Sequence, residues 1–104
     1  MLATQDDMII PVKHAQAGNI EAFDILMQNY EREIFRYLVG LLGDREEALD
    51  FAQQVFLKAW LNVANLKDPA CFNAWLHKIA RNLVRDHWRC KKTCFQSWED
   101  IEPD

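Results

Sequence analysis

The sequence predicts an all-α protein, a compact bundle of about four helices in which the third and fourth are long. Apolar residues recur three and four positions apart along almost the whole chain, which is typical of amphipathic helices. The 104 residues include only three Gly and three Pro, too few for the frequent turns of an all-β fold. Half of the residues are hydrophobic, which is enough for the core of one domain.

The first two predicted helices meet at a glycine. The first covers about residues 8–17, and Gly18 ends it in the left-handed conformation that glycine adopts readily. Asn19 then caps the second helix, which covers about residues 20–42 and ends at Gly43. The apolar face of this second helix contains Phe23, Leu26, Met27, Tyr30, Ile34, Tyr37, Leu38 and Leu41.

Acidic capping residues mark the starts of the two long helices. Asp44 precedes the third helix, predicted over about residues 45–63, where its carboxylate can accept from the first free backbone N–H groups. The dipeptide Asp68-Pro69 begins the fourth helix, because an acidic cap followed by proline is typical of a first helical turn. We expect this helix to continue to about residue 92.

The net charge of −4 is distributed unevenly along the chain. Residues 1–57 sum to −6, residues 58–76 to +1, residues 77–92 to +5 and residues 93–104 to −4. A short basic block in an acidic protein indicates a local contact with a polyanion, and a solvated helix face is the alternative. We expect residues 1–92 to form one helical domain and residues 93–104 to be an acidic linker or tail.

The third helix has two faces of different composition. Its core face contains Ala48, Phe51, Ala52, Val55, Phe56, Ala59 and Val63. Its opposite face carries Asp50, Gln53, Gln54, Leu57 and Leu61. Two leucines one turn apart among hydrogen-bonding side chains suit a helix that docks on another protein's helix. An ordinary surface with two exposed leucines is the alternative.

The fourth helix combines an apolar face with a cationic stripe. The predicted buried face contains Phe72, Trp75, Leu76, Ile79, Ala80, Leu83 and His87. The far face contains His77, Lys78, Arg81, Asn82, Arg85, Trp88, Arg89 and Lys92. A cationic stripe with an interleaved aromatic suits a single nucleic-acid strand, because cations follow the phosphates and a ring stacks on a base. The alternative is a charged surface helix on which Trp88 packs against the tail or another domain.

Four stretches of the sequence carry a family resemblance. They are Ala22-Phe23 with Leu26 and Tyr30, then Gly43-Asp44, then residues 50–60 (DFAQQVFLKAW), then residues 74–89 (AWLHKIARNLVRDHWR). In order and spacing they resemble region 2 of an extracytoplasmic-function (ECF) sigma factor of the sigma-70 family. The resemblance covers about residues 15–92, and it departs from the family's usual third-helix motif at Leu49 and Gln54, where acids are typical.

The resemblance implies a fold like sigma region 2 and two sets of site residues. In the family, the third helix docks on the clamp coiled coil of the largest catalytic subunit of core RNA polymerase. This maps onto Asp50, Gln53, Gln54, Leu57 and Lys58. The loop before the fourth helix, here about residues 62–71, holds a flipped base of the −10 promoter element, and the fourth helix contacts the non-template strand. With the stripe described above, the expected DNA-binding residues are His77, Lys78, Arg81, Asn82, Arg85, Asp86, Trp88, Arg89 and Lys92.

The expected function is therefore a sigma factor domain that docks on core RNA polymerase and recognises and melts the −10 element in transcription initiation. The family's C-terminal helix-turn-helix domain, region 4, has no counterpart after Lys92, so we expect this chain alone to bind promoter DNA weakly. The alternative is a helical protein-interaction module, for example one held by an anti-sigma factor, without DNA binding of its own. A duplex-reading repressor fits less well, because residues 62–68 are too long for the turn of a helix-turn-helix.

The remaining classes of function have weaker support in the sequence. His87, Cys90 and Cys94 could hold zinc with Cys71 or His14, but their spacing matches no zinc motif, so we expect no metal and no cofactor. The sequence contains no Gly-rich phosphate loop and no Ser/His/Asp set, so we expect no enzyme activity. It also lacks an apolar run of about 18 residues and a signal peptide, so we expect a cytoplasmic protein that contacts no membrane.

Overall fold

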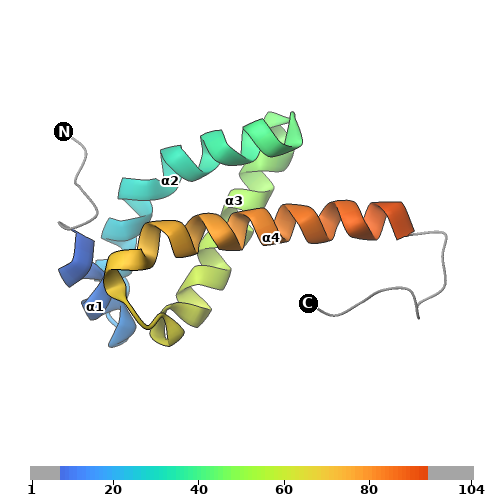
Figure 1. Ribbon diagram of the computed structural model, residues 1–104. Helices are drawn as coiled ribbons and strands as arrows, with labels where there is room; N and C mark the ends of the chain where they lie inside the picture. The colour runs from blue at the N-terminus through green and yellow to red at the C-terminus, as the bar shows by residue number, and fades with distance from the viewer. Residues whose placement is uncertain (1–7, 94–104) are drawn as a thin grey trace.

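A computed structural model describes residues 8–93, with side chains through Arg89, and this part of the chain is a bundle of four α-helices. Helix α1 spans Ile9–Gln16, α2 spans Ile20–Leu42, α3 spans Arg45–Asn62 and α4 spans Phe72–Thr93. The 3₁₀ turns η2 (Val63–Asn65) and η3 (Pro69–Cys71) connect α3 to α4. Helices α2, α3 and α4 pack against one another, and α1 packs on α2 and on both turns (Figure 1). The all-α prediction is confirmed.

The helix ends follow the capping residues that the sequence predicts. Gly18 and Gly43 both adopt a positive φ, of 98° and 71°, which a residue with a Cβ rarely adopts. Asn19 Oδ1 accepts from the backbone N–H three residues ahead at 3.1 Å. Asp44 Oδ1 accepts from the N–H groups two and three residues ahead at 2.8 and 3.1 Å. Short-range signals therefore fix both ends of α2 and the start of α3.

Helix α4 begins one turn later than predicted. Asp68 Oδ1 accepts from the N–H of Ala70 at 3.0 Å, as expected for a capping residue. The residues that follow, Pro69–Cys71, form a 3₁₀ turn, and the α-helix starts at Phe72. Such tightening is common where a helix begins. The result is a longer connection between α3 and α4, built from two tight turns that pack beside α1.

An apolar core lies between the four helices, and no charged side chain is buried in the part of the chain that the structure describes. The largest fully buried side chains are Val12, Leu26, Ile34, Leu38, Val55, Phe72, Leu76 and Val84. The predicted core faces of α2 and α3 are confirmed except at their edges. Burial raises the pKa of Tyr30, and the Glu33 carboxylate raises it by a smaller amount.

The core face of α4 is rotated slightly from the prediction. Val84 is only 2% exposed, although the sequence pattern predicts it for neither face, and His87, expected in the core, is half-buried. Val84 lies one turn after Ala80 and so extends the same buried row. The His87 ring meets the ring of Phe51 edge-on at 5.2 Å, and its Nε2 lies 3.6 Å from Glu47 Oε1. These contacts hold the second half of α4 on α3.

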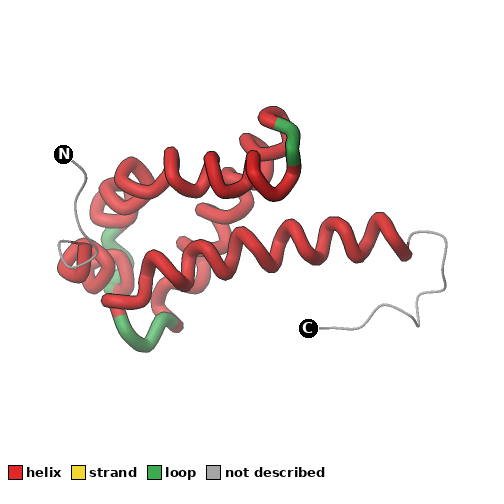
Figure 2. The backbone as a smooth tube through the Cα atoms, turned by 45° about the horizontal axis from the view of Figure 1, so that its top comes forward, coloured by secondary structure: helices red, strands yellow, loops and turns green. Residues whose placement is uncertain are grey.

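Helix α4 extends beyond the junction of α2 and α3, as Figures 1 and 2 show from two directions. This leaves one side of α4 open to solvent over much of its length. Within residues 8–93, no helix is both long and apolar enough to cross a bilayer.

Candidate functional site

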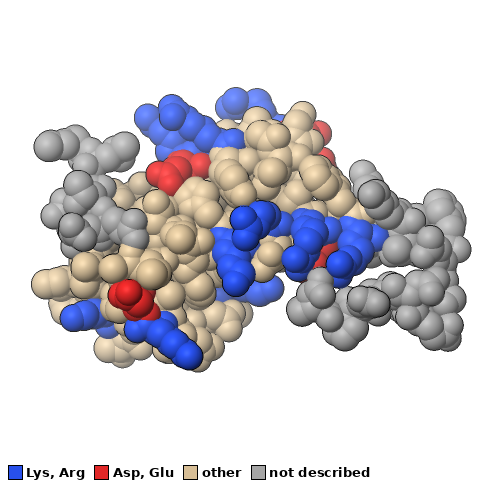
Figure 3. Space-filling model, in the orientation of Figure 1, with Lys and Arg blue, Asp and Glu red and all other residues tan. Residues whose placement is uncertain are grey.

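The solvent side of α4 carries a band of cations, here called the α4 band: Lys78, Arg81, Arg85 and Arg89. The first three side chains are exposed and Arg89 is half-buried. Because the members are three or four residues apart, they lie along one side of the helix. Figure 3 shows Lys and Arg side chains gathered over α4 on this face of the molecule. Trp88, which lies within the band, is 46% exposed, so the outward direction predicted for Arg81, Arg85 and Trp88 is confirmed.

One ion pair within the α4 band, between Arg85 and Asp86, is exposed. Arg85 Nη2 lies 3.4 Å from Asp86 Oδ1, and the two side chains are 47% and 54% exposed. An exposed pair of this kind contributes about 0–1 kcal/mol, because water screens it and the two side chains lose rotamer freedom. This pair alone therefore opposes the approach of a phosphate only weakly. Lys92, the last predicted member of the stripe, lies outside the described side chains.

His77 does not share the exposure of the α4 band. Its Nε2 lies 3.2 Å from Glu33 Oε2, its Nδ1 lies 2.9 Å from the backbone oxygen of Asn73, and its ring meets Tyr37 edge-on at 5.0 Å. The prediction that His77 points away from the bundle is wrong, because this position of α4 faces α2. Asn82 is likewise only half-exposed.

A hollow of about 240 Å³ lies between α3, η2 and α4 and is here called the hollow beside η2. It is lined by Lys58, Asn62, Asn65, Trp75 and Ile79. These residues offer a cation, two amides and the side of an indole, the groups that contact the phosphate, the edge and the face of a nucleotide. The sequence predicted a pocket in residues 62–71 but not the contributions of Trp75 and Ile79, since both match the core pattern of α4.

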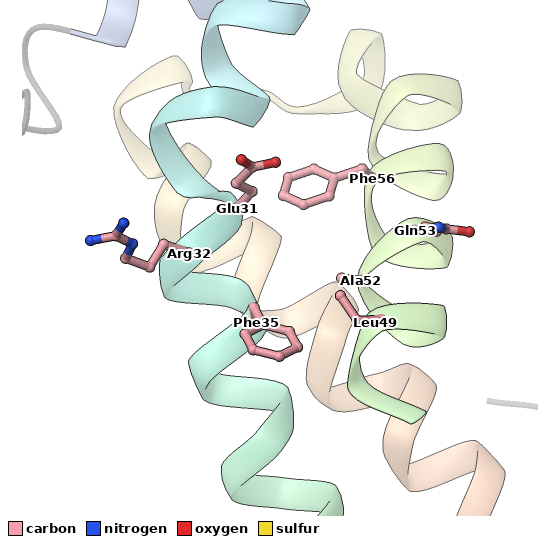
Figure 4. A pocket seen from close by; sticks show the side chains of 7 residues that line it. All are labelled: Glu31, Arg32, Phe35, Leu49, Ala52, Gln53 and Phe56. Carbon is pink, nitrogen blue, oxygen red and sulfur yellow. The ribbon is translucent and has the colours of Figure 1, made fainter. Parts of the chain in front are cut away.

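A wider groove, of about 450 Å³, lies between α2 and α3 and is here called the α2–α3 groove. It is lined by Glu31, Arg32, Phe35, Leu49, Ala52, Gln53 and Phe56. Figure 4 shows the rings of Phe35 and Phe56 entering the space from opposite helices, whereas Arg32 extends away from it. Leu49 is 56% exposed at this groove. An apolar floor with a polar rim is the surface that an amphipathic helix recognises.

The five polymerase-binding positions predicted on α3 do not share one surface. Gln53 lines the α2–α3 groove, whereas Lys58 lines the hollow beside η2. Five residues turn an α-helix by about 140° beyond one full turn, which separates the two side chains. Asp50, Gln54 and Leu57 are exposed, and Leu57 retains 61% of its accessible surface. The sequence pattern gives no sign of the groove residues of α2, because the periodicity of one helix does not reveal which helix packs beside it.

Residues 8–89 contain no group of three or more His, Cys, Asp or Glu side chains arranged to hold a metal ion. The zinc hypothesis involves Cys90 and Cys94, whose side chains lie outside those described. Cys71 is exposed, and its Sγ lies 3.7 Å from Asp68 Oδ2.

Comparison with known proteins gives a consistent family assignment. The family described as Sigma-70 region 2 matches residues 26–93, more than half of the chain. The chain is 34% identical over 87 residues to the RNA polymerase sigma-H factor of Pseudomonas aeruginosa, covering 84% of this chain and 45% of that protein. It is 33% identical over 81 residues to the ECF RNA polymerase sigma factor SigW of Bacillus subtilis, covering 78% and 43%.

A third relative is the ECF RNA polymerase sigma factor BldN of Streptomyces coelicolor, 35% identical over 82 residues that cover 78% of this chain and 31% of that protein. The chain thus spans less than half the length of the curated relatives it matches. No solved structure gives a significant match.

Proposed function

The chain belongs to the sigma-70 region 2 family, and we propose that it is the part of an ECF RNA polymerase sigma factor that joins the polymerase to an opened promoter. In this proposal the α4 band and the hollow beside η2 bind the separated −10 element. The exposed surface of α3, together with the α2–α3 groove, docks on core polymerase. The chain then acts by binding in transcription initiation and not as an enzyme.

The observation that carries the proposal is the separation of two surfaces with different chemistry. The α4 band is cationic, and three of its four side chains are exposed, which suits a polyanion. The α2–α3 groove shares no residue with the α4 band, and its floor is apolar. Because the two surfaces use different residues, the chain can hold a nucleic acid and a protein helix at the same time.

The α4 band matches a single strand in length as well as in charge. From Lys78 to Arg89 the helix rises about 16 Å, which spans several phosphates of a stacked strand. The indole of Trp88 offers an exposed ring on which a base can stack. A separated strand offers both phosphates for the cations and a base face for the indole, whereas a closed duplex keeps its base faces inside the stack. This is the basis for preferring the opened −10 element over double-stranded DNA.

The hollow beside η2 supports a role in holding one extruded base. Extrusion costs a few kcal/mol of unstacking, which contacts in a pocket must offset. Trp75 supplies an apolar wall, Asn65 an amide for a base edge and Lys58 a charge for the adjoining phosphate. Lys58 is therefore proposed here as a DNA contact, whereas the resemblance assigned it to polymerase docking.

The α2–α3 groove supports docking of one helix of the clamp coiled coil of the polymerase. Leu49 and Leu57 are 56% and 61% exposed, so an apolar partner face would remove their surface from water. Gln53 lies on the polar rim, where it can hydrogen-bond a partner residue. The proposed polymerase-binding set is thus the predicted Asp50, Gln53, Gln54 and Leu57, extended by Leu49 and the α2 side of the groove.

Capture of core RNA polymerase by the immobilised chain tests the docking half of the proposal. We expect the double variant Gln53→Ala, Leu57→Ala to lose capture. Ile10→Ala is the matched control, because Ile10 on α1 is 62% exposed and Leu57 is 61% exposed. Retained capture by the double variant, or equal loss with Ile10→Ala, would contradict the docking surface.

Fluorescence tests the DNA half and separates it from the alternative, a helical protein-interaction module such as one covered by an anti-sigma factor. The exposed leucines of α3 favour that alternative if the chain binds no DNA. We expect single-stranded DNA of −10 type to quench tryptophan emission in the parent chain and less so in Trp88→Phe. Absence of any response to the strand, together with retained polymerase capture, would favour the protein-interaction module.

A further inference from the structure

We propose that Gln16, the last residue of α1, is a positioning residue for the hollow beside η2 and so determines how selectively that hollow accepts a base. The inference rests on the proposed function, because it assigns Gln16 a part in recognising the extruded base. The residue belongs to neither predicted surface, and the sequence gives no sign of its role.

Two hydrogen bonds from the Gln16 side chain cross the molecule. Gln16 Nε2 donates to the backbone oxygen of Val63 at 3.0 Å and to that of Leu66 at 2.6 Å. The two acceptors are 47 and 50 residues away in sequence. A side-chain amide has two N–H groups, so each carbonyl receives one of them. One amide thereby joins α1 to both ends of the turn η2.

The clamped segment carries one wall of the hollow. Asn65, which lines the hollow, lies between Val63 and Leu66. The N–H of Leu66 also donates to the oxygen of Val63 at 3.1 Å, which closes the turn on itself. The Gln16 amide therefore fixes a closed turn as one piece, and with it the position from which Asn65 can reach a base edge.

The opposite wall does not depend on this clamp. Trp75 and Ile79 belong to α4, and Ile79 is 9% exposed within the common core. Loss of the Gln16 amide would let η2 shift relative to α4 while the stacking wall and the α4 band stay in place. A shift of this kind disturbs a directional hydrogen bond more than it disturbs stacking or charge contacts. Discrimination between bases should therefore fall further than overall affinity.

The test uses fluorescence anisotropy with the full chain and single-stranded oligonucleotides of −10 type. An abasic site placed at each position in turn identifies the position whose base enters the hollow. At that position, four oligonucleotides that differ only in the base give an affinity ratio for the parent chain. We expect Gln16→Met, which keeps the length but removes both donors, to reduce that ratio by about fivefold or more.

Three further variants make the result interpretable. Gln16→Lys retains N–H donors at similar reach and should restore most of the ratio. Gln28→Met, the same change at an exposed site on α2, should leave the ratio unchanged. If Gln16→Met proves unfolded by circular dichroism, Gln16→Asn replaces it, because the shorter amide cannot reach both carbonyls and should lower the ratio likewise.

The outcomes separate this inference from the proposed function. If no position of the strand shows a base-dependent affinity in the parent chain, the base pocket itself is wrong. If the parent discriminates and both Gln16→Met and Gln16→Asn keep the full ratio, the positioning role is overturned. A uniform loss of affinity for all four oligonucleotides, with a lower melting temperature and an unchanged ratio, would make Gln16 a structural residue only.

Discussion

Salt dependence offers the sharpest measurement of the α4 band. Replacing Lys78, Arg81 and Arg85 with Ala removes three exposed cations from one side of α4. Each phosphate contact of a single strand contributes about 0.7 to the slope of log affinity against log salt, so the slope should become shallower by about 2. Between roughly 50 and 200 mM salt, the parent should then lose about 20-fold more affinity than the variant.

The matched control has the same net charge as the α4 triple variant but alters another surface. Lys13, Arg32 and Arg36 are exposed on α1 and α2, so replacing them with Ala also removes three positive charges. Anisotropy of a labelled −10-type strand, titrated at several salt concentrations, gives the slope for the parent and both triple variants. An unchanged slope in the α4 variant would refute direct phosphate contact. Equal changes in the two variants would show that the general field of the protein, and not the α4 band, attracts the strand.

Two further predictions concern stability. Leu76 is fully buried, so Leu76→Ala should lower the free energy of unfolding by about 3 kcal/mol in urea titrations. Leu57→Ala, at a 61% exposed position, should change it by less than about 0.5 kcal/mol, and equal losses would contradict the core described above. Burial, and secondarily Glu33, raises the pKa of Tyr30 above its ordinary 10.0, so the unfolded chain ionises first and stability should fall as pH rises through that value. Tyr30→Phe should flatten this alkaline decline, and a decline of equal steepness in parent and variant would refute the burial effect.

Three large apolar side chains of α3 are exposed, and the proposed docking of a protein partner on this helix accounts for them. Leu49, Leu57 and Leu61 are 56%, 61% and 69% exposed, although leucine usually lies inside. Their burial by a protein partner would supply an apolar contribution to binding, which the cationic side chains of the α4 band do not supply. The proposal thus assigns apolar contact to the protein partner and charge to the nucleic acid.

The resemblance to ECF sigma region 2 and the family match agree over most of the helical part of the chain. The sequence carried this information because the family's pattern combines caps, loop lengths and helical faces, and each of these is short-range. The sequence could not show that Gln53 lines the α2–α3 groove while Lys58 lines the hollow beside η2, because that depends on where α2 and α4 lie relative to α3.

The sequence by itself determined the four helices, most of their bounds and the outward cationic side of α4. Caps such as Asn19 and Asp44 act within one turn, and periodic apolar residues select a buried face without reference to distant contacts. Only the tertiary structure decided which helices share a groove, that His77 turns toward α2, and that Gln16 clamps a turn about fifty residues away. These features depend on the packing of one helix against another, and a local pattern of residues does not specify that geometry.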